Sequence, residues 1–267
     1  MSNSLQLVLL PGFDGTGELF GPLQAALGED VASATVRYDA ERSLNEYIDS
    51  VARILPHENA VLVAESFSGP VALSLLARYP ARIKCAVLCA TFAVSPFRTL
   101  THAARYMPAF LFTPTRMQKP LLRGFCLNGE SDDALVDRAA SVVRSLSAAT
   151  IRNRLETLSG IDVTPLLLRI MAPVLYLQAT RDRIVSDRLS RQLTQALPRA
   201  TVQQIEGPHL LLQSRPAECA AAIKRFLAHQ EAKAPTPRPD PEQSYAGTPA
   251  LIPRKKSNVL NGRGDRI

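Results

Sequence analysis

The sequence contains no tryptophan, and aromatic residues make up 6% of its 267 residues. Proteins that hold single-stranded nucleic acid by stacking its bases need a surface of aromatic side chains. The composition therefore disfavours a stacking platform for nucleic acid or carbohydrate, and we expect no nucleic-acid partner.

Long apolar runs are also missing. No stretch reaches the roughly 18 unbroken apolar residues that a membrane-spanning helix needs. The chain begins with MSNS and passes directly into LQLVLL, without a basic segment followed by a long apolar one. We expect a cytoplasmic protein with no stable membrane insertion.

Cysteine is scarce, and its four positions do not have the spacing of metal ligands. Two of them, Cys85 and Cys89, lie in one apolar run, KCAVLCA, that is typical of a buried strand. We expect these two, together with Cys126 and Cys219, to be small core residues in a reducing compartment. The sequence predicts no metal site.

The formal net charge of +7 is not evenly distributed. Residues 231–267 hold seven Lys and Arg against four Asp and Glu, and the remaining excess is diffuse. The same segment includes APTPRPDP, which has too much proline and charge to form a core. We predict a disordered C-terminal tail over residues 231–267.

Short apolar runs alternate with helical periodicity along most of the chain, the pattern of βαβ units and a parallel sheet covered on both faces. The helices are predicted over residues 18–27, 44–55 (after the N-cap Ser43), 70–79, 186–197 and 216–230. The strands are predicted over residues 5–10, 32–38, 60–64, 83–89, 173–178 and 201–205. The sequence predicts an α/β fold.

The alternation stops between residues 91 and 169, where the sequence predicts a helical insertion, or lid, between two parts of the core, residues 1–90 and 170–230. Within it, residues 132–158 have the pattern of two amphipathic helices. Four arginines are expected on their polar faces: Arg138, Arg144, Arg152 and Arg154.

The start of the predicted insertion contains an apolar run, MPAFLFTPTRM, which either lines an acyl pocket or packs against the core. Its candidate pocket residues are Met107, Phe110, Leu111, Phe112 and Met117. Basic residues nearby could contact an acidic acyl carrier or form a solvated face. These are Arg105, Arg116, Lys119 and Arg123.

Ser66 lies where the apolar run VLVAE gives way to SFSGP. A serine on a tight strand-to-helix turn exposes its hydroxyl at the carboxyl edge of a sheet, and such a turn needs small residues two before and two after it. Here Ala64 and Ser68 stand where glycine is usual, and Gly69 follows, giving A-x-S-x-S-G. The alternative is a serine that only caps a helix.

A serine hydroxyl needs an imidazole to accept its proton, and the imidazole needs a carboxylate to fix its tautomer. Of the four histidines, His209 alone follows a late predicted strand, in EGPHLLL. The others lie in a polar turn, in the insertion and at the end of the last helix: His57, His102 and His229.

Asp182 is the candidate acid, because it lies in ATRDRIV just after the strand PVLYLQ. The alternative for Asp182 is a surface ion pair with Arg181 or Arg183, which contributes only about 0 to 1 kcal/mol. Asp187 is the second candidate acid, although its place suits a charge in the first turn of the next helix.

Two backbone N–H groups are candidates for an oxyanion hole, that of Phe67 after the serine and that of Phe13 in the glycine-rich LPGFDGTG. The glycines let the backbone turn closely under a ligand. This loop matches neither the dinucleotide pattern G-x-G-x-x-G nor the phosphate-binding pattern G-x-x-x-x-G-K-[ST].

With these motifs in order, residues 5–230 resemble the α/β-hydrolase superfamily. LPGFDGTG resembles the oxyanion loop, AESFSG the nucleophile elbow, ATRDRIV the acid turn and GPHLLL the histidine loop. The resemblance implies a mostly parallel, twisted sheet flanked by helices, with a lid after the strand 83–89. Two departures are Pro11, where relatives often have the histidine of an HG pair, and Glu65, where histidine is common before the serine.

The leading hypothesis is a hydrolase of a carboxylic ester or acyl thioester that works through an acyl-enzyme on Ser66, without metal or organic cofactor. Acyl transfer to an alcohol or amine would use the same intermediate. A third hypothesis is a non-catalytic binding module on this fold, against which the three intact side chains argue.

Overall fold

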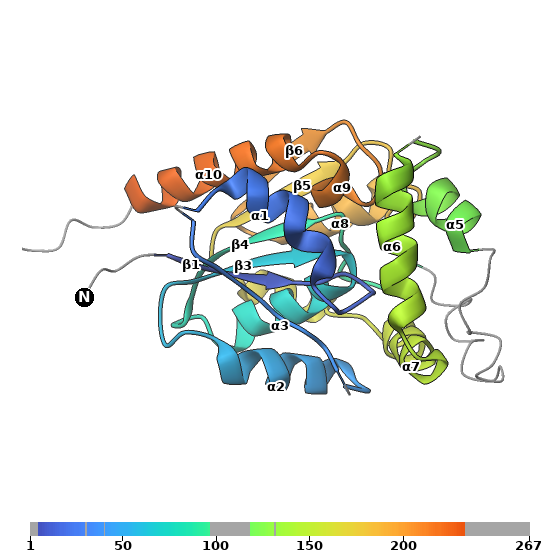
Figure 1. Ribbon diagram of the computed structural model, residues 1–267. Helices are drawn as coiled ribbons and strands as arrows, with labels where there is room; N and C mark the ends of the chain where they lie inside the picture. Colours follow the sequence, from blue (N-terminus) through green and yellow to red (C-terminus); the bar gives the residue numbers. More distant parts are fainter. Residues whose placement is uncertain (1–4, 30, 40, 97–117, 131, 233–267) are drawn as a thin grey trace, which may run out of the picture. The chain divides into compact units, whose positions relative to one another are not determined.

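The computed structural model describes residues 5–29, 31–39, 41–96, 118–130 and 132–232. Within them, six parallel strands form one sheet in the order β2-β1-β3-β4-β5-β6 (Figure 1). The predicted parallel α/β fold is confirmed. The strands are β1 (Gln6–Leu10), β2 (Ser33–Thr35), β3 (Ala60–Glu65), β4 (Ile83–Cys89), β5 (Val174–Ala179) and β6 (Ala200–Ile205).

Helices cover both faces of the sheet (Figure 1). One face packs against α1 (Gly21–Leu27), α9 (Leu211–Ser214) and α10 (Pro216–Ala232), and the other against α2 (Leu44–Ile54), α3 (Gly69–Arg78) and α8 (Asp187–Ala196). Alternate residues of β3 point to opposite faces, as the strand period of two requires. Val61 and Val63 therefore join one core cluster, and Leu62 and Ala64 join the other.

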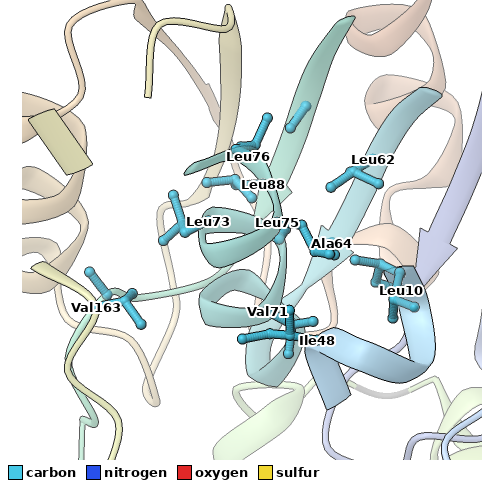
Figure 2. Close-up of a cluster of buried hydrophobic side chains, with 14 of the residues drawn as sticks. Leu10, Ile48, Leu62, Ala64, Val71, Leu73, Leu75, Leu76, Leu88 and Val163 are labelled. Atoms are coloured by element: carbon cyan, nitrogen blue, oxygen red, sulfur yellow. The ribbon is translucent and has the colours of Figure 1, made fainter. Parts of the chain in front are cut away.

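The second cluster surrounds the joint between β3 and α3. Figure 2 shows Leu62 and Ala64 of the strand beside Val71 and Leu75 of the helix, with Ile48 of α2 nearby. All five side chains are fully buried. Burial of a large apolar side chain of this kind contributes roughly 1.5 to 3 kcal/mol, so this joint is held by the core of the molecule.

Helix α2 begins where the sequence predicts. The Ser43 hydroxyl accepts a hydrogen bond from the Glu46 backbone N–H at 3.3 Å, and the Glu46 carboxylate accepts one from the Arg42 N–H at 3.0 Å. This arrangement differs from a capping box in one respect, since the carboxylate bonds the N–H of the residue before the N-cap and not that of Ser43 itself.

Two predicted elements differ in extent from the structure, and one short helix lies where the sequence predicts no element. The strand expected over residues 32–38 has only three residues, since beyond Thr35 the chain leaves the sheet and the Tyr38 N–H bonds the Gly15 carbonyl in the loop after β1. The helix expected over residues 18–27 starts as a separate 3-10 turn, η1 (Glu18–Phe20). The apolar run after His209 forms the short helix α9.

Between β4 and β5 the described chain forms α5 (Gln118–Leu121), the π-helical turn η4 (Leu122–Cys126), α6 (Asp133–Ser145), α7 (Ala148–Ser159) and η5 (Thr164–Arg169). The two predicted helices of this segment are confirmed. Figure 1 shows α6 and α7 beyond the carboxyl ends of the strands. We call residues 118–169 the insertion helices.

The apolar run over residues 107–117 and its candidate pocket residues lie outside the described residues, as do His102, Arg105 and Arg116. Lys119 and Arg123 are ion-paired with Asp137 and Asp133 of α6. These pairs engage two of the four charges on which an acidic carrier would depend.

One predicted arginine position is wrong. Arg138 and Arg144 are exposed, and Arg152 is half-buried, consistent with polar faces. Arg154 instead is 2% exposed and contacts the core of the molecule.

Of the four cysteines, Cys85, Cys89 and Cys219 are buried core residues as predicted. The prediction is wrong for Cys126, because this residue lies half-buried in η4 among the insertion helices. Burial raises the pKa of the Cys85 and Cys219 thiols to about 12, so they stay protonated.

The last helix, α10, continues to Ala232, two residues into the segment predicted as a disordered tail. The rest of that segment, residues 233–267, lies outside the described residues. No helix in the described part of the chain is both long and apolar enough to cross a membrane.

Candidate active site

Ser66 occupies the joint between β3 and the 3-10 turn η2 (Ser66–Ser68) that opens α3. Its φ angle is +48°, in the left-handed region, which costs a non-glycine residue on the order of 1 to 3 kcal/mol. The N-cap residues of η2 and α3 are Glu65 and Ser68, and the Ser66 hydroxyl contacts His209, so the helix-cap alternative is wrong.

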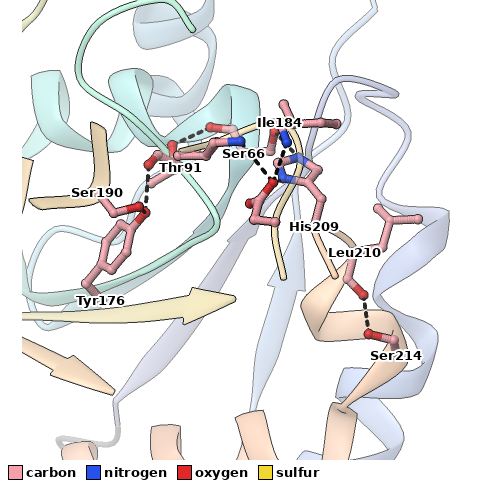
Figure 3. Close-up of polar contacts among 10 residues, drawn as sticks. Ser66, Thr91, Tyr176, Ile184, Ser190, His209, Leu210 and Ser214 are labelled. Atoms are coloured by element: carbon pink, nitrogen blue, oxygen red, sulfur yellow. Dashed lines mark hydrogen bonds and ion pairs between the residues drawn. The ribbon is translucent and has the colours of Figure 1, made fainter. Parts of the chain in front are cut away.

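Neighbouring strands stabilise this backbone. The Thr91 hydroxyl donates a hydrogen bond to the Ser66 carbonyl, and the Tyr176 hydroxyl of β5 donates to the Thr91 carbonyl at 2.8 Å (Figure 3). Thr91 also explains Gly69, because a Cβ atom at that position would lie 1.9 Å from the Thr91 hydroxyl oxygen. Position 69 therefore has no room for a side chain.

Ser68, which stands where glycine is usual, has its own hydrogen bonds. Its fully buried hydroxyl donates to the Pro11 carbonyl of the glycine-rich loop and lies 2.8 Å from the Tyr38 hydroxyl. Ser68 therefore fastens the elbow to the loop after β1. Its hydroxyl makes contacts that a glycine could not.

The structure brings Ser66, His209 and Asp182 into one chain of hydrogen bonds. The Ser66 Oγ lies 2.8 Å from His209 Nε2, and His209 Nδ1 lies 2.8 Å from Asp182 Oδ2 (Figure 3). The side chains of His209 and Asp182 are 6% and 4% exposed. With Asp182 accepting from Nδ1–H, the Nε2 atom can accept the serine proton.

The Asp182 carboxylate is fixed by its own loop. Its Oδ1 atom accepts hydrogen bonds from the N–H groups of Ile184 and Val185 at 2.7 and 2.9 Å, which leaves Oδ2 for the histidine. The alternative of a surface ion pair is wrong, because this side chain is buried and Arg181 pairs with Glu130.

The other candidates lie elsewhere. Asp187 is in the first turn of α8 and accepts a hydrogen bond from Gln178 Nε2 at 3.0 Å, as expected for a helix-terminal charge. His57 and His229 are exposed on the surface. Among the described residues, Asp182 is the carboxylate that contacts His209.

The two residues expected to supply the oxyanion donors contact each other through their side chains. The rings of Phe13 and Phe67 pack edge to face with their centroids 6.1 Å apart. The Phe13 N–H donates no hydrogen bond within the described part of the chain. The Phe67 N–H is in the first turn of a helix, where backbone donors have no intrahelical acceptor. Neither N–H group is therefore committed to an acceptor within the described residues.

The loop after β1 is shaped by a local turn. The Asp14 carboxylate accepts from the Thr16 N–H and hydroxyl at 2.9 and 2.6 Å, and the Gly15 N–H donates to the Gly12 carbonyl at 3.1 Å. Gly15 has a φ of +66°, and a Cβ atom there would lie 2.3 Å from Arg154 Nη2. Glycine is required at this position both for the backbone and for the close approach.

Arg154 of α7 is the site residue that the sequence analysis missed. Its Nη1 atom donates to the carbonyls of Phe13, at 2.9 Å, and Asp14, and its Nη2 atom donates to the Tyr38 carbonyl at 3.0 Å. The spacing of the buried residues Ile151, Arg154 and Leu158 is that of one helix face, and this pattern could have marked it.

Glu65, directly before the serine, is 2% exposed. Its Oε2 atom accepts a hydrogen bond from Gln213 Nε2 at 3.1 Å, and its Oε1 atom has no partner among the described residues. Burial, assisted by the nearby Asp14 charge, raises the pKa of Glu65 to about 7. The departure noted in the sequence therefore places a second ionisable carboxyl group beside Ser66.

Comparison with known proteins supplies the family. A family model for the alpha/beta hydrolase fold matches residues 33–214. Among solved structures, the enol-lactonase from Burkholderia xenovorans has a TM-score of 0.74 at 19% identity, covering 85% of this chain and 92% of that chain. A thermophilic esterase from Thermogutta terrifontis has a TM-score of 0.73 at 18% identity, with 86% and 92% covered.

An esterase from Rhodococcus is similar as well, with a TM-score of 0.71 at 20% identity and coverage of 84% and 90%. No curated protein matches the chain. At these sequence identities, the similarity to the solved structures shows the fold alone. The family model, however, matches more than half of the chain, and the protein therefore belongs to the α/β hydrolase fold family.

Proposed function

We propose that this member of the α/β hydrolase family is a serine hydrolase that cleaves a carboxylic ester or an acyl thioester of a small molecule. Ser66 is the proposed nucleophile, His209 the general base and acid, and Asp182 the residue that orients His209. The observation that carries the proposal is the continuous hydrogen-bond chain through these three side chains.

In the proposed reaction, His209 Nε2 takes the hydroxyl proton as Ser66 Oγ attacks the acyl carbon. The oxyanion that forms is held by the N–H groups of Phe13 and Phe67. His209 then protonates the departing alcohol or thiol, which leaves an acyl group on Ser66. Water, activated by the same imidazole, hydrolyses this acyl-enzyme and restores the serine.

The names of the similar solved structures favour carboxylic esters as the substrate class. They include two esterases and an enol-lactonase, whose substrate is a cyclic ester. The strained φ of Ser66 also supports the proposal, since strain of this kind persists where surrounding contacts hold a side chain in place for function.

The test combines covalent labelling with turnover. The wild-type protein should react with a fluorophosphonate probe and hydrolyse at least one member of a panel of p-nitrophenyl esters and acyl thioesters of increasing chain length. Ser66→Ala should remove labelling and lower kcat by on the order of 10⁶-fold, and His209→Ala should act similarly. Near-normal activity in either folded variant would contradict the assignment.

The same assay separates hydrolysis from acyl transfer. With an alcohol or amine present as a competing acceptor, the free acid should remain the main product. If transfer products dominate in water, the protein is an acyltransferase that uses the same acyl-enzyme. A folded wild-type protein that no probe labels would instead indicate a binding module.

A further inference from the structure

We propose that Arg154 is a positioning residue for the oxyanion hole, through which the insertion helices set the geometry of the loop after β1. The inference rests on the proposed function, because it assigns a role within the same reaction. Arg154 touches no predicted reacting atom; it acts on the backbone that carries the Phe13 N–H.

The Arg154 guanidinium group donates to three main-chain carbonyls. Two of them belong to consecutive residues, Phe13 and Asp14, and the third belongs to Tyr38. Holding the carbonyls of two successive peptides restricts the rotation of both peptide planes. The N–H of Phe13 belongs to the adjoining peptide, so its direction depends on this restraint.

The charge of Arg154 is buried. A buried arginine is normally paired with a carboxylate, because an isolated buried charge is costly. Among the described residues, no carboxylate forms an ion pair with Arg154; its Nη atoms donate to carbonyls instead, and its Nε atom has no partner there. A planar group with five donors can satisfy several carbonyls at once, which an ammonium group cannot do in the same geometry.

Helix α7 gives Arg154 a rigid support. Helix α7 starts at the cap Ser147, whose hydroxyl accepts from the Thr150 N–H at 3.0 Å, and packs Ile151 and Leu158 inward. One turn after Arg154, the Thr157 hydroxyl donates to the Arg42 carbonyl at 3.1 Å. The guanidinium therefore projects from a fixed helix, and Gly15 leaves room for it to lie flat on the loop.

The experiment compares Arg154→Met and Arg154→Lys with Arg152→Met, a control on the same helix whose arginine is half-exposed and pairs with Glu156. The fluorophosphonate probe counts active sites, so that kcat is expressed per competent molecule. We expect Arg154→Met to lower kcat by on the order of a hundredfold, with a smaller change in KM, as for the loss of an oxyanion donor. Arg154→Lys should be intermediate and the control close to wild type.

Chemical rescue gives a second readout. In Arg154→Ala, guanidinium ion added below the concentration that unfolds the protein should restore part of the lost kcat, whereas the ammonium ion should restore less. If Arg154 had only a structural role, the added guanidinium ion would raise the unfolding free energy of Arg154→Ala without changing its kcat per active site. If Arg154→Met does not fold, Arg154→Lys decides the question by the same measurement.

The two proposals fail in distinguishable ways. If activity requires Ser66 but kcat per active site in folded Arg154→Met or Arg154→Lys equals that of the wild type, the positioning role is overturned and the serine hydrolase remains. If neither labelling nor turnover depends on Ser66, the proposed function itself is overturned.

Discussion

The insertion helices contact the two sides of the candidate site by different means. On the side of the oxyanion loop, the contact is the buried guanidinium of Arg154, bonded to neutral carbonyls. On the side of the acid and histidine loops, it is an ion-pair cluster in which Glu130 accepts from Arg181 at 2.5 Å and from Arg215 at 2.7 Å. We call these the oxyanion side and the histidine side.

The histidine side also has backbone contacts. The Leu210 N–H donates to the Cys126 carbonyl at 3.1 Å, and Arg183 donates to the Gly124 carbonyl at 3.0 Å. The side chain of Arg181 is 39% exposed, however, so the ion pairs there are partly screened by solvent and salt. The contacts of Arg154 on the oxyanion side are buried, so dissolved salt should not weaken them. The ion pairs on the histidine side are partly exposed, so salt should weaken them.

The largest effect should come from the buried part of the histidine side. Asp182→Asn keeps an oxygen for the N–H groups of Ile184 and Val185 but can present an amide to His209, which favours the wrong tautomer. We expect kcat to fall by roughly 10⁴-fold without loss of folding. Asp187→Asn is the control and should leave kcat close to wild type. A greater loss in the control would transfer the role of acid to Asp187.

The next effect concerns the oxyanion side without altering Arg154 itself. Gly15→Ala forces a Cβ atom within 2.3 Å of Arg154 Nη2 and also strains a backbone with φ of +66°. Gly129→Ala is the control, because its φ is +79° and no atom lies within 4 Å of the added Cβ. In both variants the positive φ costs a residue with a Cβ atom roughly 1 to 2 kcal/mol.

We therefore expect Gly15→Ala to lower the unfolding free energy more than Gly129→Ala and, unlike it, to lower kcat per active site. Chemical denaturation and active-site titration measure the two quantities. Equal destabilisation of the two variants would show that the loop can move away from Arg154 at little cost.

Glu65 lies between the two sides, bonded to Gln213 of α9 and close to Asp14 of the oxyanion loop. Burial raises its pKa from 4.5 to about 7, so between these values the folded protein keeps a proton that the unfolded chain has lost. Because the folded state binds more protons, the unfolding free energy falls as the pH rises through this window and the loss persists above it.

Glu65→Gln removes this dependence. The difference in unfolding free energy between variant and wild type should shift in favour of the variant from pH 4.5 to 7 and then level off, measured by urea denaturation at a series of pH values. Glu18→Gln, which changes an exposed glutamate of η1, should show no such trend. Parallel curves for Glu65→Gln and wild type would mean that the Glu65 carboxyl does not hold its proton in the folded state.

The sheet and the candidate site differ in how much the sequence could predict. Alternation and helical periodicity follow from burial on regular elements, so the strands and the loops of Ser66, His209 and Asp182 could be located from the pattern alone. The role of Arg154 could not, because it depends on where α7 meets a loop about 140 residues earlier in the chain. The unpaired Oε1 of Glu65 likewise depends on which side chains surround it.

The smallest effect should come from the ion pairs of the histidine side. Glu130→Gln removes the charge that Arg181 and Arg215 share, and half-exposed pairs of this kind contribute about 0 to 1 kcal/mol each. We expect a slight loss of stability that shrinks as salt is added, with kcat nearly unchanged. Unfolding measured at low and high salt, beside Arg154→Met at the same two salt concentrations, tests the contrast directly. The loss in Arg154→Met should be the same at both, because its contacts are buried. If instead Glu130→Gln lowers kcat as strongly as Arg154→Met, the exposed cluster positions His209 as firmly as the buried arginine positions the oxyanion loop, and the distinction between the two sides is lost.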